Sequence, residues 1–90
     1  MKEKDLIELG FQRSEDQTPE MTGFYRTYYY YTLYLGNDTF DRFCLISNAS
    51  YEAEENNWNV IIFDYETFVF KDRYQLEKLI NVLRHNEDKK

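Results

Sequence analysis

The side chains in this 90-residue chain that could take part in catalysis are few and lie far apart in the sequence. His85 is the only histidine and Cys44 is the only cysteine. A nucleophilic cysteine needs a cationic and accessible setting, but Cys44 lies in an apolar segment with only Arg42 nearby. His85 falls in the last turn of a predicted helix, where a partly positive imidazole interacts favourably with the helix dipole. We therefore interpret Cys44 as a small buried apolar residue and His85 as a helix-end residue.

Carboxylates are more numerous, but their spacing matches no catalytic or metal-binding motif. One histidine and one cysteine cannot form a zinc site, and segment 52–57 lacks the alternating positions and the turn glycine of a calcium loop. Asp64 and Glu66 flank Tyr65 in a predicted turn. Two carboxylates can share acid–base chemistry, but hairpin turns commonly carry such residues. The three glycines are isolated and indicate no phosphate-binding loop, so we predict a non-enzymatic protein without metal or cofactor.

The most distinctive feature is the tyrosine-rich segment 24–35, which contains six of the nine tyrosines. Its composition predicts a strand, on which successive side chains point to opposite faces. One predicted face carries Tyr25, Tyr29, Tyr31, Leu33 and Leu35, and the other carries Phe24, Tyr28, Tyr30 and Tyr34. We expect one face to pack against a helix. The other is expected to be half-exposed or a contact surface, because tyrosine combines an apolar ring with a polar tip.

The remaining segments predict the elements that hold this strand. Residues 3–9 are predicted to form a short helix capped by Gly10, followed by a peripheral strand at 11–15. Residues 16–23 are polar and contain the only proline, which predicts a loop. Further strands are predicted at 40–47, 58–63 and 67–71, joined by a hairpin turn at 36–39, a polar segment at 48–57 with at most one helical turn, and a tight connection at 64–66.

Apolar residues at positions 76, 79, 80 and 83 recur at helical spacing after Asp72, which can cap a helix. They predict an amphipathic C-terminal helix of about 13 residues. We therefore predict a single α+β domain over residues 1–90. Its antiparallel sheet has four or five strands, flanked by a short N-terminal helix and the longer C-terminal helix. Strand 58–63 is apolar on both faces, which predicts a central strand covered on both sides.

The charge balance bears on the kind of partner. The net charge is −6, from 17 acidic and 11 basic residues. Direct binding of DNA or RNA requires a cationic surface, so we expect no nucleic-acid ligand and favour a protein partner with a basic surface. The single cysteine fits a reducing cytoplasm. The longest apolar run, Val60–Phe63, is too short to span a bilayer, and no signal peptide is indicated.

Three uses of the tyrosines remain open: packing within the fold, a protein-binding or self-association surface, and stacking of unpaired bases. We predict a protein-interaction module that binds its partner through exposed aromatic rings and acidic loops. The residues nominated for this contact are Tyr28, Tyr30, Tyr34, Glu52, Glu54 and Glu55. The alternative is a self-assembling structural protein, such as a homodimer, that uses the tyrosine-rich sheet as its interface.

The chain also resembles small accessory proteins of bacteriophages and mobile elements. The segments that carry this resemblance are 5–11 at the start, and 68–72 leading into 76–86 at the end, within a short, acidic, tyrosine- and asparagine-rich chain. The resemblance implies a protein that acts by binding a host or phage component. Inhibitors of bacterial defence, including anti-CRISPR proteins, belong to this group. It implies, at its most concrete, an inhibitor that occupies a basic, nucleic-acid-handling surface of a defence effector.

Overall fold

The computed structural model describes residues 1–35, 43–63 and 65–88, and it describes the side chains of these residues except those of 65–67 and 85–88. Several predicted features lie outside these limits. They are the hairpin turn at 36–39, Arg42, the Asp64 and Glu66 carboxylates, and the imidazole of His85.

The described strands form one five-stranded antiparallel sheet in which each strand pairs with the next along the chain. The strands are β1 (Gln12–Arg13), β2 (Tyr31–Leu35), β3 (Phe43–Ser47), β4 (Val60–Ile62) and β5 (Tyr65–Phe70). The predicted α+β class is confirmed, and the 11–15 strand is peripheral as expected. β5 begins at Tyr65, two residues before the predicted start, because Tyr65 already pairs with Ile62 of β4, with a register shift between Ile61 and Ile62.

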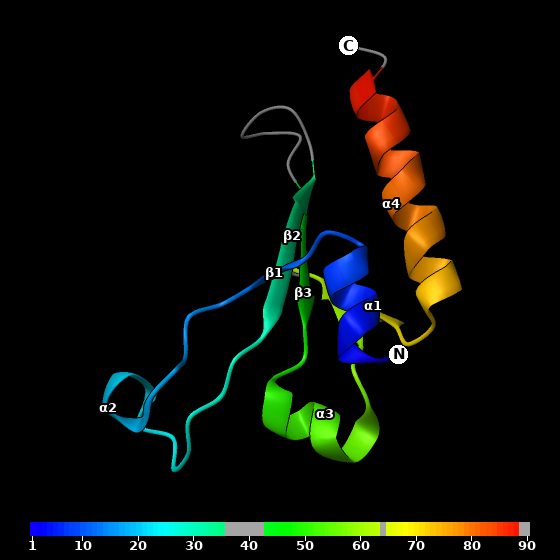
Figure 1. The fold of residues 1–90 in the computed structure, drawn as a ribbon. Helices are drawn as coiled ribbons and strands as arrows, with labels where there is room; N and C mark the ends of the chain where they lie inside the picture. Colours follow the sequence, from blue (N-terminus) through cyan, green and yellow to red (C-terminus); the bar gives the residue numbers. More distant parts are fainter. Residues whose placement is uncertain (36–42, 64, 89–90) are drawn as a thin grey trace.

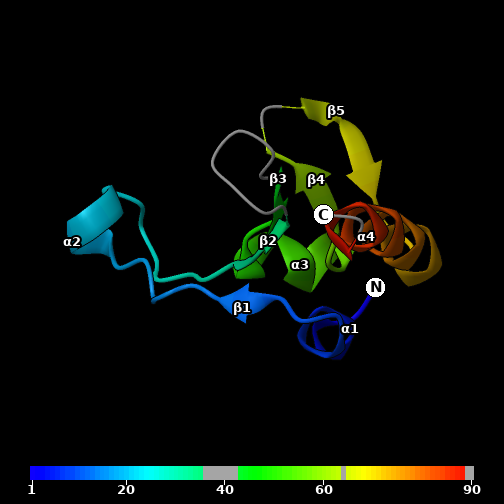
Figure 2. The ribbon, with the colours of Figure 1, turned by 90° about the horizontal axis from the view of Figure 1, so that it is seen from above.

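Two helices lie on one side of this sheet, α1 (Glu3–Glu8) and α4 (Arg73–Asp88). Figure 1 shows α1 and α4 to the right of β2 and β3, and Figure 2 shows both helices on the same side of the strands, with no described helix over the opposite side. Gly10 has a φ of +98°, the left-handed conformation predicted for the cap of α1. None of the described helices has the length and apolar character needed to cross a lipid bilayer.

The core lies between these helices and the sheet. Leu6 of α1, Leu45 of β3, Val60 of β4 and Leu76 of α4 are fully buried. Arg73 links the two helices, since its guanidinium lies 2.9 Å from the Asp5 carboxylate and 2.6 Å from that of Glu8. The pKa of Asp5 is lowered, first because the Lys2 N–H donates to its carboxylate and second because Arg73 does.

Two shorter helices were not fully predicted from the sequence. The predicted loop 16–23 contains α2 (Pro19–Thr22), which begins with a proline and ends at Gly23 with a φ of +76°. The segment 48–57 contains α3 (Ser50–Asn56), which exceeds the single turn predicted. α3 is supported at its start by the Glu52 carboxylate, which accepts a hydrogen bond from the Ala49 N–H.

The tyrosine-rich segment is a strand only in its second half. Residues 24–30 form no regular strand pairing apart from one bridge between Gln17 and Tyr28. The reason is that β1 pairs with β2 over only two residues. Tyr31, Leu33 and Leu35 share one face as predicted, and the structure buries this face in the core. Tyr25 was placed with them wrongly, since it lies before the strand and is 79% exposed.

Candidate functional site

The sheet surface that faces away from α1 and α4 carries two rows of side chains. The strand register aligns Thr32, Ile46, Ile61 and Val69 in one row across four strands. A second row contains Tyr34 opposite Cys44, and the Phe63 N–H donates to the Cys44 carbonyl at 2.8 Å. We call this surface the open face, defined by Thr32, Tyr34, Cys44, Ile46, Ile61, Phe63 and Val69.

The open face corrects two predictions. Strand 58–63 was expected to be covered on both sides, but the structure buries Trp58 and Val60 on the covered side, whereas Phe63 on the open face is 55% exposed. The reason is that both helices that pack on the sheet lie on the same side. Cys44, predicted to be buried, is half-buried on the open face for the same reason.

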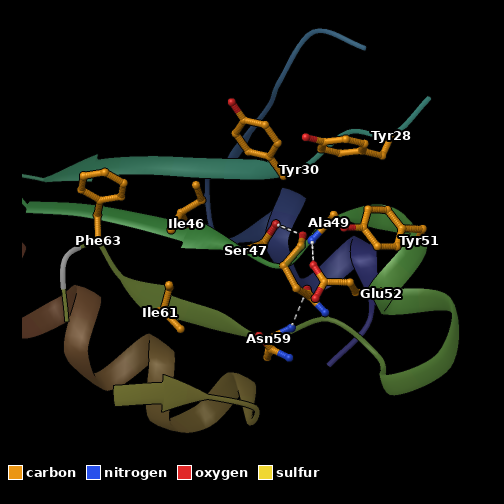
Figure 3. Close-up of a pocket in the computed structure, with 11 residues that line it drawn as sticks. Tyr28, Tyr30, Ile46, Ser47, Ala49, Tyr51, Glu52, Asn59, Ile61 and Phe63 are labelled. Carbon is orange, nitrogen blue, oxygen red and sulfur yellow. Dashed lines mark hydrogen bonds between the residues drawn. The ribbon is translucent and has the colours of Figure 1, made fainter. Parts of the chain in front are cut away.

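A hollow of about 680 Å³ occupies the end of the open face nearest to α3. Figure 3 shows Phe63 at one end of this hollow, Ile46 and Ile61 along it, and Tyr51 and Glu52 at the other end. Tyr28 and Tyr30 border it from the segment before β2. The volume falls within the range of small-ligand sites, roughly 300–1,000 Å³.

Aromatic rings form the wall at the α3 end. The Phe24 ring stacks on Tyr51 with centroids 4.9 Å apart, and the Tyr28 ring stands at 80° to Tyr51 with centroids 5.4 Å apart. The guanidinium carbon of Arg26 lies 6.0 Å from the centroid of the Tyr51 ring, and Arg26 Nη2 lies 3.4 Å from Glu54 Oε1. These contacts attach the segment before β2 to α3. The pKa of Tyr51 is raised, first by burial and next by the Glu52 charge.

Polar groups beneath the rings already have partners in the fold. The Ser47 hydroxyl accepts from the Tyr31 N–H at 2.8 Å and donates to the Asn48 carbonyl. The Asn48 side-chain oxygen accepts from the Asn59 N–H at 3.1 Å. Glu52 Oε1 accepts from Ala49, whereas no described residue donates to Glu52 Oε2. The base of the hollow is therefore held in place, and one carboxylate oxygen remains available to a ligand.

The six nominated residues separate into three groups. Tyr28, Tyr30 and Glu52 line the hollow together. Tyr34 lies on the open face outside it and is 58% exposed. Glu54 pairs with Arg26 beside a second hollow, and Glu55 is exposed on α3 and lines neither described hollow.

Sequence reasoning missed Tyr51, Ile61 and Phe63 as parts of this site. Tyr51 directly precedes the nominated Glu52, and Ile61 and Phe63 alternate in a strand that was assigned to the core. The alternation placed these two side chains on one face, but no local signal shows which face the helices leave uncovered.

The second hollow, of about 400 Å³, lies around Glu3, Arg13, Tyr29 and Trp58. The hydroxyls of Tyr29 and Tyr31 both donate to Glu3 Oε2, at 3.0 and 2.6 Å. Burial, followed by the hydrogen bond to Glu3, raises the pKa of Tyr31 far above its usual value. The Arg13 guanidinium carbon lies 3.7 Å from the Tyr29 ring centroid. These groups satisfy one another and connect α1 to β2, so we interpret them as structural.

Among the described residues, no three histidine, cysteine or carboxylate side chains gather in a way that could hold a metal ion. The resemblance to phage and mobile-element proteins stays a prediction. Comparisons of the chain with protein-family models, with curated proteins and with solved structures give no match.

Proposed function

We propose that the protein is a non-enzymatic interaction module that binds another protein through the open face. The observation that supports this proposal is the row of apolar side chains, Ile46, Ile61 and Val69, that crosses three strands without a covering helix in the described part of the chain. Scattered apolar residues are normal on protein surfaces, but a contiguous apolar patch is typical of an interaction site. Tyrosine and phenylalanine at such a surface favour a protein partner, because both are enriched in protein interfaces.

Charge supports a partner with a basic surface. The chain carries a net charge of −6, and Glu52 lies at one end of the open face. Opposite charges on the two surfaces would accelerate association and align the partners. In its most concrete form, the proposal is a phage-type inhibitor in a reducing cytoplasm that covers the basic, nucleic-acid-handling surface of a defence effector.

The test is a tagged pull-down from host lysate, with and without nuclease, comparing Phe63→Arg with Val82→Arg. Phe63 lies on the open face, whereas Val82 is 59% exposed on α4. Both variants add one positive charge at an exposed apolar position. The proposal predicts one stoichiometric protein that survives nuclease, is lost with Phe63→Arg and is retained with Val82→Arg. Retention by both variants, or a partner that disappears with nuclease, would contradict it.

Self-association is the second candidate. β5 lies at the edge of the described sheet, and it exposes Val69 on the open face and Phe68 on the opposite face. Exposed apolar edge strands can pair between copies. Sedimentation across a hundredfold concentration range separates the candidates. A strict monomer eliminates self-association, and a dimer that Val69→Arg dissociates would replace the leading proposal.

A further inference from the structure

We propose that the hollow at the α3 end of the open face receives an arginine side chain from a basic segment of the partner. The guanidinium would lie against the Tyr28 and Tyr51 rings and pair with the Glu52 carboxylate. This inference rests on the proposed function and names the chemistry that the open face recognises at one end. The hollow, at about 680 Å³, has room for an extended side chain together with its neighbouring backbone.

The aromatic rings supply the first part of the recognition. The rings of Tyr28 and Tyr51 stand at 80° to each other and form two walls at the same end of the hollow as Glu52 (Figure 3). A cation within about 6 Å of such a ring is attracted by the negative charge of the ring face. A carboxylate beside the rings adds a charge-assisted hydrogen bond.

The fold already contains one guanidinium held in this way. The guanidinium carbon of Arg26 lies 6.0 Å from the centroid of the Tyr51 ring, and Arg26 Nη2 lies 3.4 Å from Glu54 Oε1 of α3. Glu52 has no such partner among the described residues, and its Oε2 accepts no hydrogen bond there. The hollow therefore offers the same combination of a ring and a carboxylate that Arg26 contacts.

Arginine suits this site better than lysine. Its planar guanidinium can stack on a ring and donate to a carboxylate at the same time, and it is less strongly hydrated than an ammonium group. The Tyr28 and Tyr51 hydroxyl oxygens can accept further N–H groups of the guanidinium. Apolar Ile46, Ile61 and Phe63 line the rest of the hollow and suit the methylene stem of the side chain.

The experiment is an NMR titration of the full chain with a capped pentapeptide that contains two arginines separated by glycine. Peptides with lysine or uncharged citrulline in place of arginine serve as comparison ligands. The arginine peptide should produce saturable shifts at the amides of Tyr28, Tyr51, Glu52 and Ile61. Citrulline should bind about tenfold more weakly or not at all, and lysine should lie between the two.

Two glutamine variants provide the matched control. Glu52→Gln keeps an oxygen that can accept from Ala49, so α3 is retained, while Glu55→Gln removes the same charge outside the hollow. Glu52→Gln should weaken the arginine peptide about tenfold, and Glu55→Gln less than twofold. Equal effects of the two variants, equal binding of citrulline, or shifts confined to Glu3 and Arg13 at the second hollow would overturn the proposal.

The two proposals fail in different ways. If partner capture depends on Phe63 but not on Glu52, the open face binds the partner without an arginine in the hollow. If capture is independent of Phe63, the proposed function itself is wrong, whatever the peptide does.

Discussion

The two faces of the sheet carry similar side chains in different surroundings. On the covered face, Leu45 and Val60 lie under α1 and α4 and are fully buried. On the open face, their chain neighbours Ile46 and Ile61 form an apolar row that no described helix covers. An amphipathic strand exposes polar residues on its outer face, and β3 and β4 do not. The difference shows that the helices bury only one of the two apolar faces of β3 and β4.

Replacing neighbouring residues of β3 tests this comparison most strongly. Leu45→Ala is expected to lower the free energy of unfolding by about 2–5 kcal/mol, because it leaves a cavity in the covered core. Ile46→Ala, one residue further and on the open face, should cost about 1 kcal/mol or less. Urea unfolding followed by tryptophan fluorescence measures both. Equal losses would show that the open face is packed as tightly as the core.

Two tyrosine-to-phenylalanine substitutions, one on each face, provide a second comparison. Tyr31→Phe removes the hydroxyl that donates to Glu3 at 2.6 Å and connects β2 to α1. It should cost about 1.5–3 kcal/mol, since hydrogen bonds to charged groups contribute this much. Tyr30→Phe at the hollow should change the free energy of unfolding by less than about 0.5 kcal/mol. A larger effect of Tyr30→Phe in the same urea experiment would reverse the assignment of roles.

The pH dependence should come from the covered side. The folded pKa of Asp5 is lowered, first by the Lys2 N–H and then by Arg73, so its contribution to stability is present above the ordinary pKa of 3.8. The contribution is lost as the pH falls below this value through the folded pKa, where protonation weakens both contacts. In the Asp5→Asn variant, the melting temperature should therefore fall less steeply than in the wild type as the pH is lowered from about 5 to about 2. Glu20→Gln on exposed α2 is the control and should leave this dependence of the melting temperature on pH unchanged.

The smallest effect is expected from the open face itself. Phe63→Ser should change the free energy of unfolding by no more than about 0.5 kcal/mol, since Phe63 is exposed. The same change should reduce the fluorescence of a hydrophobic dye bound to the native protein, because it removes a large ring from the apolar patch. Val82→Ser on α4 should leave dye binding unchanged. Similar dye signals for the wild type and Phe63→Ser would show that the patch lies elsewhere.

Much of the fold could be predicted because its signals are local. Gly10 after the N-terminal helix, helical spacing from Leu76 to Leu83, and alternation along β2 each depend on residues within one or two turns or strands. Local reasoning failed at 24–30, where a β-prone composition predicted a longer strand. Pairing there depends on how many residues of β1 lie alongside, and a strand without a partner does not persist.

The candidate site was predictable only in part. Tyr28, Tyr30 and Glu52 were nominated and lie around one hollow, but Glu54 was nominated with them and pairs with Arg26. Adjacent positions on a helix point in different directions, so a cluster of glutamates in sequence does not form a cluster in space.

The amino-acid sequence by itself determined the α+β class, the succession of strand segments along the chain, and the apolar side chains on both surfaces of β3 and β4, because composition and spacing act over short distances. The tertiary structure decided which surface is covered and which rings meet. Tyr28 and Tyr51 meet because the chain before β2 packs on α3, and the register of β3 with β4 places Phe63 at the other end of the same hollow. Such non-local contacts depend on the whole fold. The placement of both α1 and α4 on one side of the sheet left the other side open.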